Sequence, residues 1–244
     1  MDCLNHTSHR PWPLVDSRPS WRQYWLDLAF FHWPVRKAQI QATLPDGLEV
    51  DTYDGDAWIS VVPFRMEGVM MRGLPSIPGI SNFPELNLRT YVKRDDKPGV
   101  WFYSLDADQS LAVWAARKFF HLPYFKANMS SVANADGSIR YRSCRECSGA
   151  SFEGVYQPVG ETYKAERGSL EEWLCERYCL YACSKSGKLY RGEVHHRQWP
   201  LQKVQYQIHK NGIGEAFGFD LSDAPYCAQF AKKLEVAVWG VELC

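Results

Sequence analysis

The sequence predicts an α+β protein built on a mostly antiparallel, strongly curled β-sheet. Three observations carry this prediction. Many short β-leaning runs are joined by hairpin signals such as the Asp54-Gly55 turn. Only three modest segments have helical spacing, and strands and helices do not alternate as they do in a parallel sheet. A large antiparallel sheet with few helices buries its apolar faces by curling on itself.

The elements can be justified in chain order. Residues 1–20 are polar and proline-rich, so we expect a flexible N-terminal arm before a single domain at 21–244. The aromatic run 21–31 favours a strand, and His32-Trp33-Pro34 is expected to turn the chain. Pro34 then suits the start of a short helix over 35–44.

The next part of the chain favours strands interrupted by one long loop. Residues 48–64 predict two strands around the Asp54-Gly55 turn. Residues 68–82 are rich in Gly, Pro and Met without any period, which is typical of a lid or binding loop. Strands are expected at 82–92 and from 100 onward, separated by a turn at 97–99.

The second half adds two helices and more hairpins. Apolar spacing predicts a helix over 109–122, which Pro123 ends. Ser169 and Glu172 form a capping-box pattern at the start of a helix over 169–178. Turn residues at 134–137 and 185–188 predict two hairpins.

Composition excludes several classes of function. The 28 basic and 28 acidic residues give a net charge of 0, without long runs of one sign, which argues against nucleic acid or anionic membrane as a partner. The chain shows neither a signal peptide nor an 18-residue apolar run, so we expect a cytoplasmic protein with its 8 cysteines reduced. Walker, GxGxxG and GxSxG motifs are absent.

One strand carries an unusual row of polar side chains. Along NFPELNLRTYV (82–92), Glu85, Asn87, Arg89 and Tyr91 share one parity and therefore one face. Two interpretations stay open: this face meets solvent, or it lines a polar cavity. The neighbouring run 100–103 is large and apolar on both parities, which indicates burial and favours the cavity.

Several segments together resemble one known family. They are LAFFHWPV (28–35), LPDGLEVDTYDGDAW (44–58), FPELNLRTYV (83–92), WFYSLDA (101–107), LPYFKA (122–127), and ERY (176–178) followed by HHRQWP (195–200). From about residue 21 to the end, the chain resembles the YqjF-like family of uncharacterised bacterial proteins, placed with the acetoacetate-decarboxylase-like superfamily. The resemblance implies a bacterial origin and a cone-like, mainly antiparallel β-barrel with a ligand cavity and peripheral helices.

The resemblance also shows departures from the decarboxylases. Those enzymes form a Schiff base through a lysine in a Pro-Lys-Lys run. At the matching position this chain has Leu-Pro-Tyr, so Tyr124 stands where the reactive lysine would be and Phe125 replaces the second lysine. Lys126 shares the face of Tyr124 on a strand and is a remaining amine. Glu85 corresponds to one active-site glutamate, whereas the strand containing WISVV lacks the other.

Other candidate residues have plain structural alternatives. His195 and His196 are adjacent on a strand and point to opposite faces, so at most one of them can face a shared cavity. We keep His195 as a candidate ligand contact, and also His32, which is expected near the cavity mouth. Cys144 and Cys147 have metal-like spacing but lack a second pair, so we predict no metal or other cofactor. Arg177 is expected to form a structural ion pair.

These observations lead to one leading hypothesis and one rival. The leading hypothesis is a small-molecule-binding barrel that acts on a carbonyl or carboxylate compound by acid–base chemistry, with Glu85, Arg89, Tyr124 and Lys126 as the reacting group. Tyr91, Asn87, His32 and His195 would contact the ligand. The rival is a non-catalytic ligand-binding protein on the same scaffold. The oligomeric state stays open, with a homo-oligomer allowed.

Overall fold

The computed structural model describes residues 1–73 and 81–244. Its α-helices are α1 (Lys37–Gln41), α2 (Ser110–Phe120) and α3 (Leu170–Cys175), and short 3-10 turns form η1 (Asp2–Asn5) and η2 (Glu215–Phe217). The strands are β1 (Trp21–Val35), β2 (Glu49–Val50), β3 (Ala57–Met71), β4 (Phe83–Arg94), β5 (Lys97–Ala107), β6 (Tyr124–Ala133), β7 (Ile139–Arg145), β8 (Ser151–Tyr163), β9 (Cys179–Cys183), β10 (Leu189–His196), β11 (Leu201–Asn211) and β12 (Cys227–Leu243).

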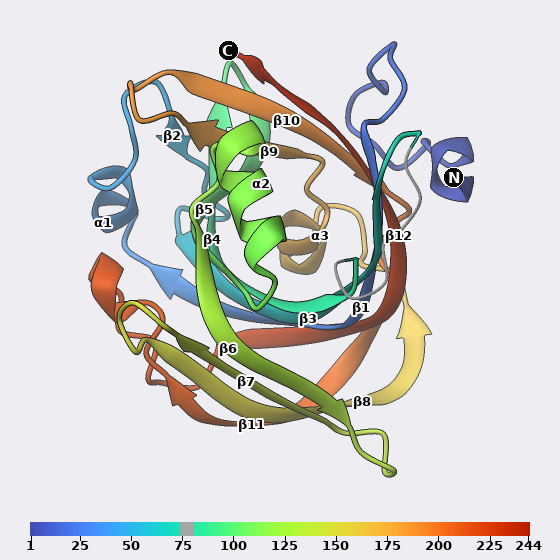
Figure 1. The fold of residues 1–244 in the computed structure, drawn as a ribbon, viewed down its shortest axis with the longest axis vertical. Helices are drawn as coiled ribbons and strands as arrows, with labels where there is room; N and C mark the ends of the chain where they lie inside the picture. Colours follow the sequence, from blue (N-terminus) through green and yellow to red (C-terminus); the bar gives the residue numbers. More distant parts are fainter. Residues whose placement is uncertain (74–80) are drawn as a thin grey trace.

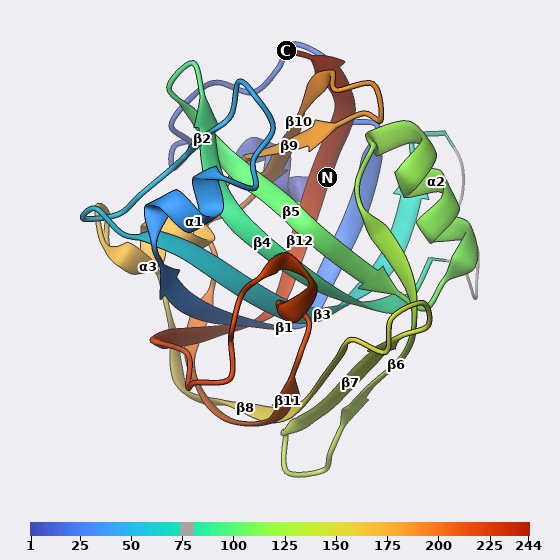
Figure 2. The ribbon, with the colours of Figure 1, turned by 90° about the vertical axis from the view of Figure 1, so that its left-hand side faces the viewer.

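The described strands form one large curled sheet. Its order is β10-β9-β5-β6-β7-β8-β11-β12-β1-β3-β4-β2, and β10 also pairs with β12, as β5 does with β4. All pairings are antiparallel except β5 with β6 and β5 with β9. In Figure 1 the strands curl around α2 and α3, and Figure 2 shows α1 and α3 on the side opposite α2. The predicted α+β class with a mostly antiparallel, curled sheet is confirmed.

Both faces of the central strands are buried. On β1, Leu28 and Phe30 join one apolar cluster, whereas Ala29 and Phe31 join a second cluster on the other face. The alternation follows from the two-residue period of a strand. The polar row of β4 lies on the same face as the first cluster, so the curl of the sheet turns these polar groups inward.

The predicted turn at His32-Trp33-Pro34 is wrong, because β1 continues through it to Val35. Pairing of β1 with β12 ends at His32, so the missing N–H of Pro34 removes no hydrogen bond to β12. The helix that follows is shorter than predicted and begins after Arg36. Asp27 has a positive φ of 51° beside the register shift between β1 and β3, a bulge that bends the strand.

Two further expectations differ from the structure. The Asp54-Gly55 turn closes only a single bridge, between Tyr53 and Asp56, and β2 pairs with β4 instead of β3. The segment predicted as a loop over 68–82 is partly strand, since β3 extends to Met71. Residues 74–80 of that segment lie outside the described residues. The hairpins at 134–137 and 185–188 are confirmed, as is the cap of α3, where Ser169 Oγ accepts from the backbone N–H of Glu172 at 3.2 Å.

The N-terminal segment makes several contacts with the sheet. Cys3 is buried, and its carbonyl accepts a hydrogen bond of 2.9 Å from His195. The guanidinium of Arg10 is enclosed and forms an ion pair of 3.1 Å with Glu193. Trp12 Nε1 donates to the same carboxylate at 3.0 Å. Residues 1–20 therefore pack on the outside of β10 and β12. Within the described residues, no helix is both long and apolar enough to cross a membrane.

Candidate functional site

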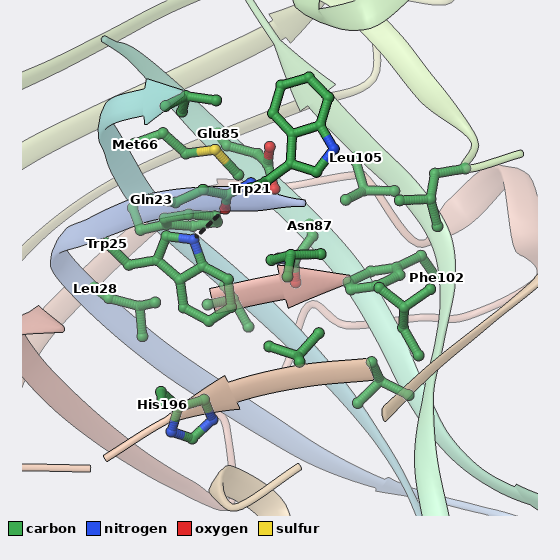
Figure 3. Close-up of a pocket in the computed structure, with 18 of the residues that line it drawn as sticks. Trp21, Gln23, Trp25, Leu28, Met66, Glu85, Asn87, Phe102, Leu105 and His196 are labelled. Carbon is green, nitrogen blue, oxygen red and sulfur yellow. Dashed lines mark hydrogen bonds between the residues drawn. The ribbon is translucent and has the colours of Figure 1, made fainter. Parts of the chain in front are cut away.

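A cavity of about 330 Å³ opens on the inward face of the curled sheet. This volume is at the lower end of the range of about 300–1,000 Å³ typical of small-molecule sites. Most of its wall is apolar, and Figure 3 shows Trp21, Trp25, Phe102 and Leu105 around the space. The wall residues with a charged, amide, hydroxyl, imidazole or thiol group are Gln23, Ser81, Glu85, Asn87, Arg89, Tyr124, Cys175, Arg177, Cys179 and His196.

Glu85 and Tyr124 form the first polar group of the wall. Glu85 is on β4 opposite Ala107 of β5, and the parallel pairing of β5 with β6 places Tyr124 beside Leu105. The hydroxyl of Tyr124 donates to Glu85 Oε2 at 2.7 Å, and that of Tyr141 donates to the backbone oxygen of Glu85 at 2.6 Å. Both side chains of the pair are buried, so the sheet holds a carboxyl–phenol pair away from bulk water.

Burial changes the charge state of this pair. The pKa of Glu85 is raised to about 8, mainly by desolvation and in small part by the charge of Asp106, while the hydrogen bond from Tyr124 acts to lower it. The pKa of Tyr124 is raised well above its usual value by burial and by the neighbouring Glu85. Glu85 is therefore mostly protonated at neutral pH and titrates close to it, which suits a general acid or base.

Arg89 forms a second polar group deeper along β4. Its Nη2 donates to the carbonyl of Leu174 at 3.3 Å, and its guanidinium carbon lies 5.3 Å from the ring centre of Phe30. Arg89 is 8% exposed, and its Nε is buried without a hydrogen-bond partner. Over the described residues, no carboxylate comes within 4.0 Å of its nitrogens in an ion pair. The wall thus carries a cation without an anionic partner.

Arg177 is a wall residue that the sequence did not single out for binding. Its Nη1 pairs with Asp51 at 2.7 Å, and its guanidinium carbon lies 4.2 Å from the ring centre of Trp173. Its Nη2 is buried and has no hydrogen-bond partner. The ion pair expected of Arg177 exists, but Glu176, its neighbour in sequence, instead accepts from Tyr178 and from the backbone of Trp199. Only the fold reveals that Arg177 lines the same cavity as Arg89.

Asn87 lies between the two polar groups. It shares the face of Glu85 and Arg89, and its Oδ1 is buried without a partner. Figure 3 shows Asn87 near the middle of the cavity, with Glu85 and His196 toward opposite ends. The structure therefore brings together Glu85, Asn87, Arg89 and Tyr124 from the predicted set.

His32 and Tyr91 are buried beside this wall but do not line the cavity. The hydroxyl of Tyr91 and Nδ1 of His32 each lie 2.6 Å from Ser60 Oγ, and His32 Nε2 donates to Gln229 Oε1 at 3.0 Å. Burial and the charge of Arg89 lower the pKa of His32 to about 3, so the ring is neutral. Tyr91 also packs its ring 4.9 Å from the guanidinium carbon of Arg177. Both residues support the wall from behind.

The histidine pair divides as strand alternation requires, but the residue on the wall is His196. His195 faces the N-terminal segment, where its Nδ1 lies 3.2 Å from Arg10 Nη1. His196 lines the cavity beside Trp199, with 5.0 Å between ring centres. Burial lowers the pKa of His196 to about 3, so it is neutral near pH 7. Which of the two histidines lines the cavity depends on which face of β10 points inward. The sequence of β10 alone does not reveal that face.

Lys126 lies away from the cavity wall. Its Nζ donates to the backbone oxygen of Asp108, and none of the described residues on the wall is a lysine. Cys144, near the end of β7, and Cys147, in the turn before β8, are free thiols. Across the described part of the chain, no three His, Cys, Asp or Glu side chains are grouped as metal ligands would be.

Comparison with known proteins supports this architecture. The family model DUF2071, described as an uncharacterized conserved protein, matches residues 22–235. The uncharacterized protein YqjF of Bacillus subtilis (strain 168) is 47% identical over 219 residues, which is 89% of this chain and 90% of YqjF.

Solved structures show the same fold at low identity. The enduracididine biosynthesis enzyme MppR complexed with pyruvate has a TM-score of 0.65 and 14% identity, covering 94% of this chain and 91% of MppR. An acetoacetate decarboxylase-like enzyme from Sphingomonas wittichii RW1 has a TM-score of 0.63 and 13% identity, covering 98% of both chains. Acetoacetate decarboxylase from Legionella pneumophila has a TM-score of 0.61 and 11% identity, covering 98% and 94% of the two chains.

Proposed function

The chain belongs to the DUF2071 family, with the fold of acetoacetate-decarboxylase-like proteins, and we propose that it binds a small carbonyl or carboxylate compound in its cavity and moves a proton on it through Glu85. The observation that carries this proposal is a buried carboxyl whose pKa is raised to about 8, hydrogen-bonded to Tyr124 on a cavity wall. Such a group is stable in its protonated form and titrates in the range where proton transfer in both directions is fast.

The wall supplies the parts that such chemistry needs. A carbonyl oxygen next to Tyr124 would accept a hydrogen bond from its hydroxyl, which would turn from Glu85 to the ligand and stabilise the enolate as it forms. Glu85 is also placed to take a proton from the adjacent carbon once it is ionised. Arg89 supplies a positive charge for an acidic group of the compound. Proton exchange beside a carbonyl is therefore the reaction that these residues support best.

Chemistry through an imine is not part of this proposal. Tyr124, which the family resemblance matches to the reactive lysine of the decarboxylases, is on the wall, and Lys126 makes its contact outside the cavity. The same observation supports a second candidate function, which is binding without reaction. The two candidates agree on the ligand class and differ only in whether Glu85 exchanges protons with the ligand.

Hydrogen–deuterium exchange separates these two candidates. Wild-type protein is incubated in D₂O with acetoacetate, levulinate or para-acetylbenzoate, and proton NMR follows the loss of the signal next to the ketone. We expect acceleration by the wild type and a loss of at least about 100-fold in Glu85→Gln, the range of general acid–base catalysis. The melting temperature of the variant should not fall at neutral pH, because Gln can still accept from Tyr124.

Contrary results are equally clear. A Glu85→Gln protein that exchanges as fast as the wild type rules out the proton-transfer role, and one that unfolds makes Glu85 structural. Ligand binding without exchange in the wild type favours the non-catalytic candidate. Borohydride treatment followed by mass spectrometry is the control for imine chemistry, and an adduct on Lys126 would restore that mechanism.

A further inference from the structure

The two polar groups of the cavity are far apart. Glu85 and Arg89 are four residues apart on β4, so their α-carbons are separated by roughly 13 Å at about 3.3 Å per residue. Within the described residues the two side chains form no ion pair. The charge of Arg89 lowers the pKa of His32 but is not among the influences on the pKa of Glu85, which agrees with this separation.

The end of the cavity that contains Arg89 and Arg177 has unpaired donors that suit one anionic group. Arg89 Nε and Arg177 Nη2 are buried donors without partners, and only Arg177 has a carboxylate of its own, Asp51. An unpaired buried donor is costly, and a buried cation without an anion is more so. A ligand carboxylate would offset the charge of Arg89, because charged hydrogen bonds of this kind are the strong ones.

Between the two ends the wall is hydrocarbon. Asn87, which lies between Glu85 and Arg89, is paired with Val62 on one side and Leu105 on the other. Phe30 lies over Arg89, and Phe102 is the register partner of Arg89 on β5. All four apolar residues line the cavity. This middle section favours an apolar group and leaves Asn87 as the polar contact beside it.

We propose that the ligand is an elongated organic acid with three parts in a row: a carboxylate at Arg89 and Arg177, an apolar body against Phe30, Val62, Phe102 and Leu105, and a carbonyl or hydroxyl oxygen at Glu85 and Tyr124. This inference rests on the proposed function for the Glu85 end only. It excludes short keto acids as good ligands, because one or two bonds between carboxylate and ketone cannot span the two ends.

The test measures affinity by titration calorimetry on the full chain with matched small acids. Para-acetylbenzoate has the carboxylate, ring and ketone in line, para-acetylbenzamide removes only the charge, and acetoacetate removes the apolar body. We expect para-acetylbenzoate to bind at least about tenfold more tightly than either, since tenfold corresponds to about 1.4 kcal/mol, less than one charged hydrogen bond.

One variant and one control localise the effect. Arg89→Met should remove the preference for the acid over the amide, while the same change at exposed Arg36 should keep it. Equal binding of acid and amide by the wild type, tighter binding of acetoacetate, or absence of binding by para-acetylbenzoate would overturn the inference. If acetoacetate binds best and exchanges through Glu85, the proposed function stands while this inference fails. If para-acetylbenzoate binds through Arg89 but Glu85→Gln has no effect on exchange, this inference stands and the proposed proton transfer fails.

Discussion

Two neighbouring groups of buried polar residues differ in how completely they are paired. The group behind the wall forms a chain in which the Tyr91 hydroxyl contacts Ser60, Ser60 contacts His32, and His32 donates to Gln229. The group on the wall leaves Asn87 Oδ1 and the Nε of Arg89 without partners. The residues of both groups are buried, so burial alone does not distinguish them.

The difference shows what each group is suited to do. Buried polar groups are normally hydrogen-bonded, and a complete chain fixes side chains in place and contributes to stability. Unpaired groups on a cavity wall lower stability and gain partners only when something enters. We therefore expect substitutions behind the wall to cost stability, and substitutions on the wall to cost binding.

The largest loss of stability is expected at His32. Replacing it with Ala should lower the free energy of unfolding by about 4 kcal/mol, because it leaves a cavity and removes a partner from both Ser60 and Gln229. Denaturant unfolding gives the value. His209→Ala, at an exposed position on β11, is the matched control and should change stability by less than about 0.5 kcal/mol. A loss of stability below about 1 kcal/mol in His32→Ala would contradict the structural role of the group behind the wall.

The next effect is a pH dependence at Glu85. The pKa of Glu85 is about 8 in the folded protein, and its ordinary value is 4.5. Between these pH values the unfolded chain binds fewer protons than the folded protein does, so the stability of the wild type falls as the pH rises from 4.5 to 8. Gln cannot ionise. The stability of Glu85→Gln relative to wild type should rise by about 5 kcal/mol from pH 4.5 to 8, at about 1.4 kcal/mol per pH unit, and stay constant outside this window.

The control for this measurement is Glu49→Gln, at an exposed site. Glu176, with a pKa raised to about 7 by burial, adds to the slope of the wild type, so only the difference between variant and wild type is diagnostic. A difference that does not change with pH would show that Glu85 ionises as an ordinary surface carboxyl does.

A smaller effect is expected at Tyr91. Phe keeps the ring against Trp173 and Arg177 but removes the hydroxyl that contacts Ser60, so stability should fall by about 1 kcal/mol. Tyr226→Phe is the control, because that side chain is 69% exposed. Equal values for the two variants would mean that the hydrogen-bonded chain contributes nothing measurable.

The smallest effect on stability should be at Arg89. Met fills similar space and removes a buried charge that lacks an ion pair, so Arg89→Met should change the free energy of unfolding by less than about 1 kcal/mol, in either direction. Thermal unfolding without ligand measures this. A loss as large as that at His32 would place Arg89 among the structural residues.

Sequence patterns predicted the fold class and favoured a cavity for the polar row of β4 while leaving a solvated face open, because hairpin signals and strand alternation are local. They failed where a partner strand decided the outcome. The strand continues through His32-Trp33-Pro34 because β12 does not pair with Pro34, so no hydrogen bond from its nitrogen is needed there. On β10, His196 and not His195 points into the cavity. Arg177 was missed as a wall residue because its partners Asp51 and Trp173 come together only in the fold. Contacts between distant segments set these details.

Three tryptophans, Trp21, Trp25 and Trp199, form part of the cavity wall. Trp25 and Trp199 stack with 5.9 Å between ring centres. Any molecule that fills the cavity must displace water from these indoles or lie against them, and indole emission responds to both changes. The tryptophan fluorescence of the protein should therefore change when a ligand binds in the cavity. Libraries of unlabelled acids can be screened for binding by this signal.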